Sequence, residues 1–145
     1  MTTEHTDTGA LVAAARAAAR RAYAPYSRYA VGAAVEADDG RVFTGCNVEN
    51  ASYGLTICAE RAAVCAAVSA GVRRIRRVAI AASGPAVPYP CGACRQVLAE
   101  FADAAAEVQI ALGDGATCEK ITLGALLPKA FGLGNTPPGA ERKTE

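Results

Sequence analysis

The segment PCGACRQVL, residues 90–98, places a C-x-x-C pair where a helix is predicted to begin. Proline suits the first position of a helix, because the N–H that it lacks would have no partner there. Cys91 and Cys94 therefore fall in the first turn, three residues apart on one face. The unpaired N–H groups and the helix dipole at this end favour negative charge and lower the pKa of thiols. The segment thus predicts two adjacent thiolates, which suit either a metal site or a redox disulfide.

A third cysteine, Cys58, stands at the start of another predicted helix, in the segment TICAERAAV. It makes a metal site more favoured than a dithiol oxidoreductase that uses Cys91 and Cys94 alone. Three thiolates without a fourth protein ligand make an open tetrahedral zinc site, whose free position holds water. The single histidine, His5, lies in a polar leader and is not expected to be a ligand. Cys46 is the best candidate for a fourth ligand, and a site closed by it would be a non-catalytic structural-zinc module.

Glu60 follows Cys58 by two residues, at a helix start where both side chains can turn toward one pocket. A glutamate in that place can simply stabilise the helix dipole, an effect of about 0.3–1 kcal/mol. It can also carry a proton between water and a substrate. The second interpretation is favoured by P-C-x-x-C roughly thirty residues later, because the pairing is the signature of zinc nucleobase deaminases.

Three segments together resemble the small homotetrameric, zinc-dependent cytidine deaminases whose zinc ligands are all cysteines. They are PYSRYAVGAAV, GCNVENASYGLTICAERAAV and PCGACRQVLAEF, and the resemblance covers about residues 13–131. It implies one Zn²⁺ per subunit, held by Cys58, Cys91 and Cys94. It also implies that Glu60 is the catalytic residue that carries the proton.

The function implied by this resemblance is hydrolytic deamination of cytidine and 2′-deoxycytidine to uridine and 2′-deoxyuridine, with release of ammonia, in pyrimidine salvage. The nearest alternative is a deaminase of another cytosine nucleoside, such as blasticidin S. The implied fold is a single three-layer α/β/α domain with a mixed five-stranded sheet, and the implied assembly is a homotetramer.

The same resemblance gives roles to further residues. Asn47 and Glu49, in the segment NVE, are implied to bind the ribose hydroxyls. If the segment is extended, alternation points these two side chains one way and Val48 the other. Tyr29 stands where many relatives have a phenylalanine facing the pyrimidine ring, and it offers the same aromatic face. Arg61 is implied to hydrogen-bond to the ligand sulfurs.

Two aromatic residues, Tyr53 and Phe131, resemble residues that approach the active site of a neighbouring subunit in the tetrameric family. If they do so here, oligomerisation completes the pocket. The alternative is that they are ordinary core or surface aromatic side chains.

The apolar pattern along the chain predicts one α/β domain over residues 1–145. The tails, 1–8 and about 133–145, are polar and are predicted to be flexible. The elements expected between them are a helix at 9–23, a hairpin turning at Asp39-Gly40, a helix at 58–70, an apolar strand at 76–83, a helix at 91–103, a strand from 107 and a strand or short helix at 121–131.

Charge argues against a nucleic-acid partner, because the net charge is +1 and the basic cluster is limited to RRIRR, residues 73–77. No run of eighteen apolar residues is present, so no membrane span is expected. The N-terminal segment MTTEHTDTG is polar and acidic, unlike a signal peptide. Without such a signal, the six cysteines are expected to be free thiols. The sequence predicts a soluble cytoplasmic protein that takes a small nucleoside, with Cys46, Cys65 and Cys118 as core or incidental side chains.

Overall fold

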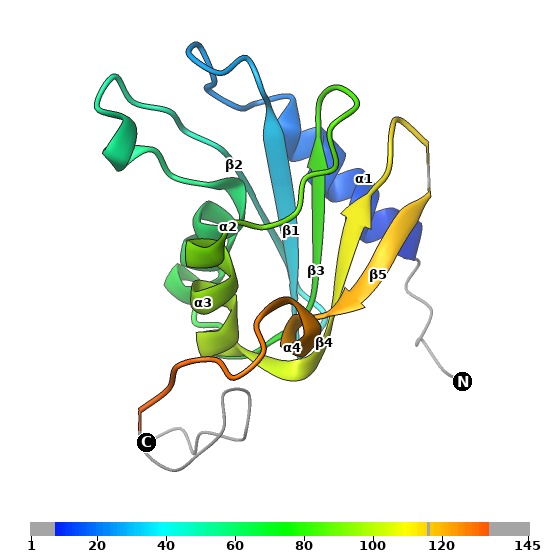
Figure 1. Ribbon diagram of the computed structural model, residues 1–145. Coiled ribbons are helices and arrows are strands. Elements are labelled where there is room, and N and C mark those ends of the chain that lie inside the picture. Colours follow the sequence, from blue (N-terminus) through cyan, green and yellow to red (C-terminus); the bar gives the residue numbers. More distant parts are fainter. Residues whose placement is uncertain (1–7, 116, 134–145) are drawn as a thin grey trace.

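The computed structural model describes residues 8–115 and 117–133, which form one five-stranded sheet covered by helices (Figure 1). The strands are β1 (Val31–Ala37), β2 (Val42–Cys46), β3 (Ile75–Ala82), β4 (Ala102–Ala111) and β5 (Cys118–Thr122). Their order across the sheet is β2-β1-β3-β4-β5. β3 and β4 run parallel, and the other neighbours are antiparallel. The predicted mixed five-stranded sheet is confirmed.

Helices lie on both faces of this sheet. α1 (Thr8–Ala19) packs on one face, and α2 (Ala59–Ser69) and α3 (Gly92–Phe101) lie side by side on the other (Figure 1). Two short helices complete the described chain: η1 (Tyr53–Leu55) before α2, and α4 (Leu123–Leu126) after β5. The three-layer α/β/α architecture is therefore confirmed. Within residues 8–115 and 117–133, no helix is long and apolar enough to cross a membrane.

The hydrophobic core is divided by the sheet into two parts. The larger part lies between the sheet and α2, α3 and α4, where large side chains such as Ile80, Leu98 and Ile110 are fully buried. From Val78 to Ala82, β3 is apolar on both faces, as expected for a strand that is covered on both sides. The part under α1 is built from smaller residues: Leu11, Val12, Ala15, Ala34, Ala79, Ala81 and Ala111.

Two glycines let a helix approach the sheet closely. A Cβ added at Gly32 of β1 would lie 2.0 Å from the carbonyl oxygen of Ala15 in α1. A Cβ added at Gly45 of β2 would lie 2.4 Å from the backbone nitrogen of Ala63 in α2. Both contacts are with helix backbone, which cannot move aside as a flexible side chain can. Glycine is therefore required at both positions if the helices are to keep their distance from the sheet.

The α1 face of the sheet also carries a buried carboxylate, on the same strand as Ala34 of the small apolar residues. Glu36 in β1 is 3% exposed and points to the same face as Ala34, two residues earlier. Its two oxygens accept hydrogen bonds from Arg76 and Arg77, at the start of β3. These ion pairs satisfy the charge that burial would otherwise leave without a partner.

The first predicted helix is shorter than expected. α1 ends at Ala19, and Tyr23 instead pairs with the segment around Val48. The Tyr23 N–H donates to the Asn47 carbonyl (3.0 Å), and its carbonyl accepts from the Glu49 N–H (2.8 Å). This pairing joins segments distant in sequence, so the helical periodicity of residues 9–23 could not reveal it.

The other predicted elements need smaller corrections. The helix expected at 91–103 ends at Phe101, and the next residue, Ala102, already pairs with Ile75 at the beginning of β4. The segment 121–131 is divided between the end of β5 and α4. The tails predicted to be flexible lie outside the described residues, apart from Thr8, which is the first residue of α1, and Leu133.

Candidate active site

Three cysteines meet where α2 and α3 begin. Cys58 is the N-cap residue of α2, Cys91 is the N-cap residue of α3, and Cys94 lies in the first turn of α3. Their sulfur atoms all lie within 4.8 Å of one another, and the Sγ atoms of Cys58 and Cys91 are 3.8 Å apart. Unpaired backbone N–H groups at both helix starts favour negative charge on these sulfurs.

This three-sulfur cluster fits a zinc ion by its chemistry. Thiolates are soft ligands that zinc accepts, and three of them leave a fourth tetrahedral position open. In the part of the chain that the structure describes, the residues that could hold a metal ion together are Cys58, Cys91 and Cys94, and Cys46 is not among them. His5 lies outside the described residues. The geometry therefore favours an open site over one closed by Cys46.

The negative charge of the cluster is concentrated on Cys58. A hydrogen bond from Cys94, and further hydrogen bonds from Arg61 and Cys91, lower the pKa of Cys58 to about 5. Arg61 donates from Nη2 to the Cys58 sulfur and to the Thr56 carbonyl, both at 3.4 Å. The pKa of Cys94 is raised, first by its hydrogen bond to Cys58 and then by burial. A bound cation would stabilise negative charge on these neighbouring sulfurs, which is a second reason why the cluster fits a metal.

Glu60 lies in the first turn of α2, next to the sulfurs. It is 4% exposed, and burial raises its pKa, with the charge of Cys58 raising it further. A glutamate that served only the helix dipole would keep its carboxylate in water, where ionisation is cheapest. A buried carboxyl group with a raised pKa is instead suited to take up and release a proton near neutral pH.

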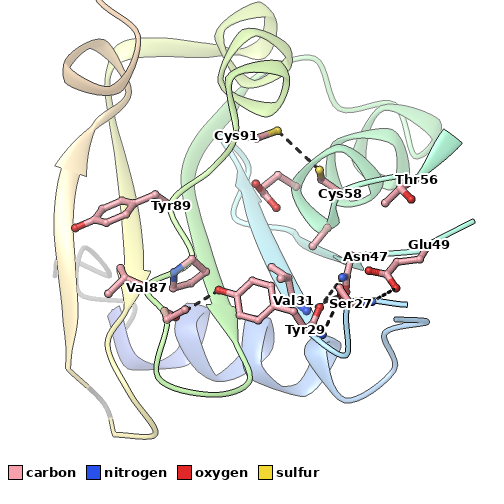
Figure 2. A pocket seen from close by; sticks show the side chains of 14 residues that line it. Ser27, Tyr29, Val31, Asn47, Glu49, Thr56, Cys58, Val87, Tyr89 and Cys91 are labelled. Atoms are coloured by element: carbon pink, nitrogen blue, oxygen red, sulfur yellow. Dashed lines mark hydrogen bonds between the residues drawn. The ribbon is translucent and has the colours of Figure 1, made fainter. Parts of the chain in front are cut away.

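A cavity of about 570 Å³ opens above these residues (Figure 2). This volume is within the range of about 300–1,000 Å³ that is typical of small-molecule sites. Cys58, Ala59, Glu60 and Cys91 lie at the metal-site end of the cavity. The remaining walls are Ser27, Tyr29, Val31, Asn47, Glu49, Thr56, Ala86, Val87, Pro88 and Tyr89.

Asn47 and Glu49 both line the cavity and Val48 does not, as strand alternation predicts. The side chain of Asn47 is fixed at both ends, since Oδ1 accepts from Val31 N–H (2.9 Å) and Nδ2 donates to the Tyr29 carbonyl (2.8 Å). Glu49 Oε1 accepts from the backbone N–H groups of Ser27 (3.1 Å) and Tyr26 (2.9 Å). Hydrogen bonds from Ser27 and then Tyr26 hold the pKa of Glu49 below its usual value. Both side chains are thus fixed before any ligand arrives.

Tyr29 also lines the cavity, and its hydroxyl donates to the carbonyl of Ala86 at 3.3 Å (Figure 2). Partial burial and the nearby charge of Glu60 raise the pKa of Tyr29. The ring therefore shares the cavity with Glu60.

Tyr53 and Phe131 do not line this cavity. They are 75% and 71% exposed, respectively. Tyr53 instead lines a smaller neighbouring cavity of about 230 Å³, together with Tyr26 and Glu49, and its ring meets that of Tyr26 edge to face. The carbonyl of Phe131 accepts a hydrogen bond from Gln96 (3.2 Å), which holds its segment beside α3.

Several wall residues carried no signal in the sequence. Ser27 and Thr56 lie in loops, and Ala86, Val87, Pro88 and Tyr89 belong to the turn-rich segment before Cys91. The one local hint is that this segment leads directly into the P-C-x-x-C motif, so it had to pass close to the sulfurs. Which of its residues face the cavity depends on contacts with distant strands.

Residues 5–112 match the family profile described as "Cytidine and deoxycytidylate deaminase zinc-binding region". A cytidine deaminase of Sporosarcina psychrophila is 43% identical over 136 residues, which cover 94% of this chain and 99% of that protein. A cytidine deaminase of Mycobacterium tuberculosis is 51% identical over 120 residues, which cover 83% of this chain and 86% of that protein.

Solved structures give the same result. The crystal structure of a cytidine deaminase from Burkholderia pseudomallei matches with a TM-score of 0.79 and 46% identity, covering 90% of this chain and all of that one. The crystal structure of the cytidine deaminase from Mycobacterium tuberculosis matches with a TM-score of 0.76 and 50% identity, covering 88% and 98%. Sequence profile, relatives over nearly their whole length and fold agree, and the chain belongs to the cytidine deaminase family.

Proposed function

We propose that this protein deaminates cytidine and 2′-deoxycytidine by hydrolysis, releasing ammonia and the corresponding uridine nucleoside, as a step of pyrimidine salvage. The observation that carries the proposal is the position of Glu60, a buried carboxyl group beside three clustered cysteine sulfurs at one end of a small-molecule cavity. A proton carrier next to a metal site is the arrangement that hydrolytic deamination requires.

One zinc ion per chain would be held by Cys58, Cys91 and Cys94. When bound, zinc lowers the pKa of a coordinated water and thereby supplies a nucleophile at neutral pH. Glu60 takes one proton from the water that attacks C4 and delivers it to N3 of the pyrimidine. It then moves the remaining proton from the new C4 hydroxyl to the amino group, so that C4=O forms as the C4–N bond breaks and ammonia leaves. Burial raises the pKa of Glu60, and a carboxyl group with a raised pKa is better suited both to accept and to return a proton than one with its ordinary pKa.

Arg61 is proposed to offset the charge of the three thiolates. Its guanidinium contacts the Cys58 sulfur, and that hydrogen bond raises the pKa of Arg61, so the positive charge is fixed in place. Hydrogen bonds to ligand atoms of this kind tune how strongly a sulfur donates to its metal.

The substrate is held at the other end of the cavity. We assign the sugar hydroxyls to Glu49 and Asn47, because Glu49 keeps its carboxylate ionised and both side chains are oriented by backbone groups. Tyr29 is assigned to the pyrimidine ring, which an aromatic face suits.

The cavity favours a nucleoside over a nucleotide. Its described lining includes the carboxylates of Glu49 and Glu60 and no lysine, arginine or histidine. The described lining of the smaller cavity beside Tyr53 includes Glu49 and likewise no lysine, arginine or histidine. A 5′-phosphate would enter such a site without a cation to balance it. Although the matching family profile covers deoxycytidylate deaminases as well, the charges of this site favour cytidine over cytidine monophosphate.

The test is to purify the protein, measure its zinc content and follow the loss of cytidine absorbance. Cytidine, 2′-deoxycytidine, deoxycytidine monophosphate and blasticidin S are compared under one set of conditions. We expect about one zinc per chain and turnover of both nucleosides, with the monophosphate slower by at least about tenfold. A large preference for blasticidin S or for the monophosphate would contradict the proposal, and zinc without turnover of any substrate would support a structural module.

We also propose that the active form is a cytoplasmic homotetramer. The aromatic rings of Tyr53 and Phe131, together with Leu55 at 64% exposure, present apolar surface that association would cover. Three neighbouring cysteines without a disulfide suit a reducing compartment. Light scattering coupled to gel filtration measures the assembly, and a monomer with full activity would contradict completion of the pocket by a neighbouring subunit.

A further inference from the structure

One wall of the cavity is the segment 83–90, which we call the wall loop. It connects β3 to α3, and the residue after it is Cys91. Ala86, Val87, Pro88 and Tyr89 of this loop line the cavity (Figure 2). The loop therefore spans the distance between the sheet and the sulfur cluster, and its position sets the width of the cavity on that side.

The base of the wall loop continues the sheet. Ser83 N–H donates to the Ala30 carbonyl (2.8 Å), and Ala30 N–H donates to Ser83 Oγ (3.1 Å). At Gly84 the backbone has φ +80°, a left-handed conformation that glycine adopts readily, and the chain leaves the ladder. Beyond this point the loop needs other contacts to keep its place.

Two tyrosine hydroxyls supply such contacts from opposite sides. The hydroxyl of Tyr29 donates to the Ala86 carbonyl (3.3 Å), so the residue before β1 holds the middle of the loop. The hydroxyl of Tyr89 donates to Glu119 Oε2 on β5, so the end of the loop is held to the far edge of the sheet. In Figure 2 the Tyr89 ring extends away from the two labelled cysteines, toward that edge.

The Tyr89 contact is the more decisive of the two. Its ring is half exposed, so burial alone does not fix it. Its N–H donates to the Val87 carbonyl (2.9 Å), which makes a tight turn around Pro88 and transmits the position of Tyr89 to the other wall residues. A hydrogen bond from a hydroxyl to a carboxylate is also stronger than a hydrogen bond between two neutral groups.

We propose that Tyr89, Glu119 and the hydroxyl of Tyr29 are positioning residues that hold the wall loop in place and so set substrate affinity. The proposal rests on the proposed function for its kinetic part. None of the three hydroxyl and carboxylate groups acts on the reacting atoms in this scheme. Each acts through the loop, which the substrate meets on binding.

Loss of these contacts should weaken ground-state binding more than chemistry. The groups that carry out the reaction are held elsewhere, by the starts of α2 and α3. A change that loosens a binding wall raises KM, whereas a change in a group that acts only in the transition state lowers kcat. A split between KM and kcat therefore distinguishes a wall from a catalytic group.

The test uses the zinc-loaded protein and the variants Tyr89→Phe, Glu119→Ala, Glu119→Gln and Tyr29→Phe. We expect KM for cytidine to rise about three- to tenfold in Tyr89→Phe and Glu119→Ala, the factor that loss of one hydrogen bond produces, with kcat within about twofold. Glu119→Gln should keep a KM close to that of the parent, because its amide oxygen still accepts from Tyr89. The double variant Tyr89→Phe with Glu119→Ala should equal either single one, since both remove the same bond.

Tyr29→Phe should raise KM by a smaller factor, about two- to threefold, because it loses a longer hydrogen bond between neutral groups and keeps the aromatic face. Tyr23→Phe is the matched control, since it removes a tyrosine hydroxyl without a described contact to the loop and should leave KM unchanged. A parental KM in Tyr89→Phe, or a Glu119→Gln variant as impaired as Glu119→Ala, would overturn the proposal.

Hydrogen exchange gives a readout that does not depend on turnover. The amides of residues 84, 86, 87 and 89 should exchange at least about threefold faster in Tyr89→Phe, while the amides of β1 and β3 keep their rates. Acceleration spread over the whole sheet would show general destabilisation and overturn the positioning role. If the parent protein failed to convert cytidine, the proposed function would fall, and the exchange data would still decide whether these residues hold the loop.

Discussion

On each face of the sheet a helix is pressed against a strand at a glycine: α1 at Gly32 and α2 at Gly45. The two faces then differ in what lies beyond that contact. On the α1 face, the described residues include the buried Glu36, which forms ion pairs with Arg76 and Arg77. On the opposite face, two helices begin side by side, and their starts bring together the sulfur cluster, Glu60 and a cavity.

The difference teaches that close packing is common to both faces, whereas convergence of helix starts is particular to one. A helix start presents unpaired N–H groups and a positive dipole end, which stabilise anionic side chains. Where two of them meet, three thiolates and a carboxylate can stand close together. We therefore expect substitutions on the α2–α3 face to reduce zinc binding and turnover. Substitutions on the α1 face should reduce only the free energy of unfolding.

The largest effect is expected from removing a ligand. Cys58→Ala should abolish stoichiometric zinc binding and, with it, detectable cytidine turnover, because two sulfurs make a poor zinc site. Cys46→Ala is the matched control, since Cys46 is outside the three-sulfur cluster. Zinc is measured by atomic absorption on the purified variants. Loss of zinc from Cys46→Ala would show that four cysteines hold the metal and would contradict an open three-cysteine site.

Glu60→Gln should remove chemistry and leave the metal in place. We expect kcat to fall by about 10³–10⁴, the contribution of a well-placed general acid and base, with the zinc content unchanged. The amide also avoids the burial of a carboxylate, so the free energy of unfolding should not decrease. Turnover within tenfold of the parent would exclude Glu60 as the proton carrier.

A matched pair of glycine variants compares the two faces directly. Gly45→Ala and Gly32→Ala should each lower the free energy of unfolding by about 3 kcal/mol, because each Cβ overlaps helix backbone. Only Gly45→Ala should also lower kcat, by about ten- to a hundredfold, since it displaces the helix that carries Cys58 and Glu60. Urea denaturation and steady-state kinetics check both. Equal loss of kcat in the two variants would mean that the faces are coupled through the sheet.

The smallest effect is expected from Glu36→Gln on the α1 face. It removes the buried charge that Arg76 and Arg77 share, and should cost about 2 kcal/mol of unfolding free energy. Zinc content and kcat should match the parent, because none of the described residues on that face lines the cavity. A change in kcat would contradict the expectation that the α1 face does not affect catalysis.

What the sequence predicted well was local. The starts of two helices, the C-x-x-C spacing and the glutamate two residues after Cys58 are properties of short segments, and the structure brings Cys58, Cys91 and Cys94 within reach of one metal ion. The apolar run in residues 76–83 likewise predicted a strand, and the structure has β3 there. The family resemblance then supplied the number of strands and the three-layer arrangement, which no short pattern carries.

What the sequence did not predict depends on distant partners. Tyr23 leaves the expected helix because it pairs with Val48, and Tyr89 gains meaning only through Glu119, thirty residues later in the chain. The need for glycine at 32 and 45 is set by how near two helices lie. No local propensity encodes such contacts, because each is a property of two segments at once.

Cys58 and Cys91 stand 33 residues apart in the chain, each at the cap of its own helix. A zinc ion that joins them ties α2, β3 and the wall loop into a ring, much as a covalent cross-link would. Because such an ion binds the folded chain and not the unfolded one, its free concentration enters the folding equilibrium directly. Zinc starvation would therefore lower the free energy of unfolding of this chain as well as its turnover.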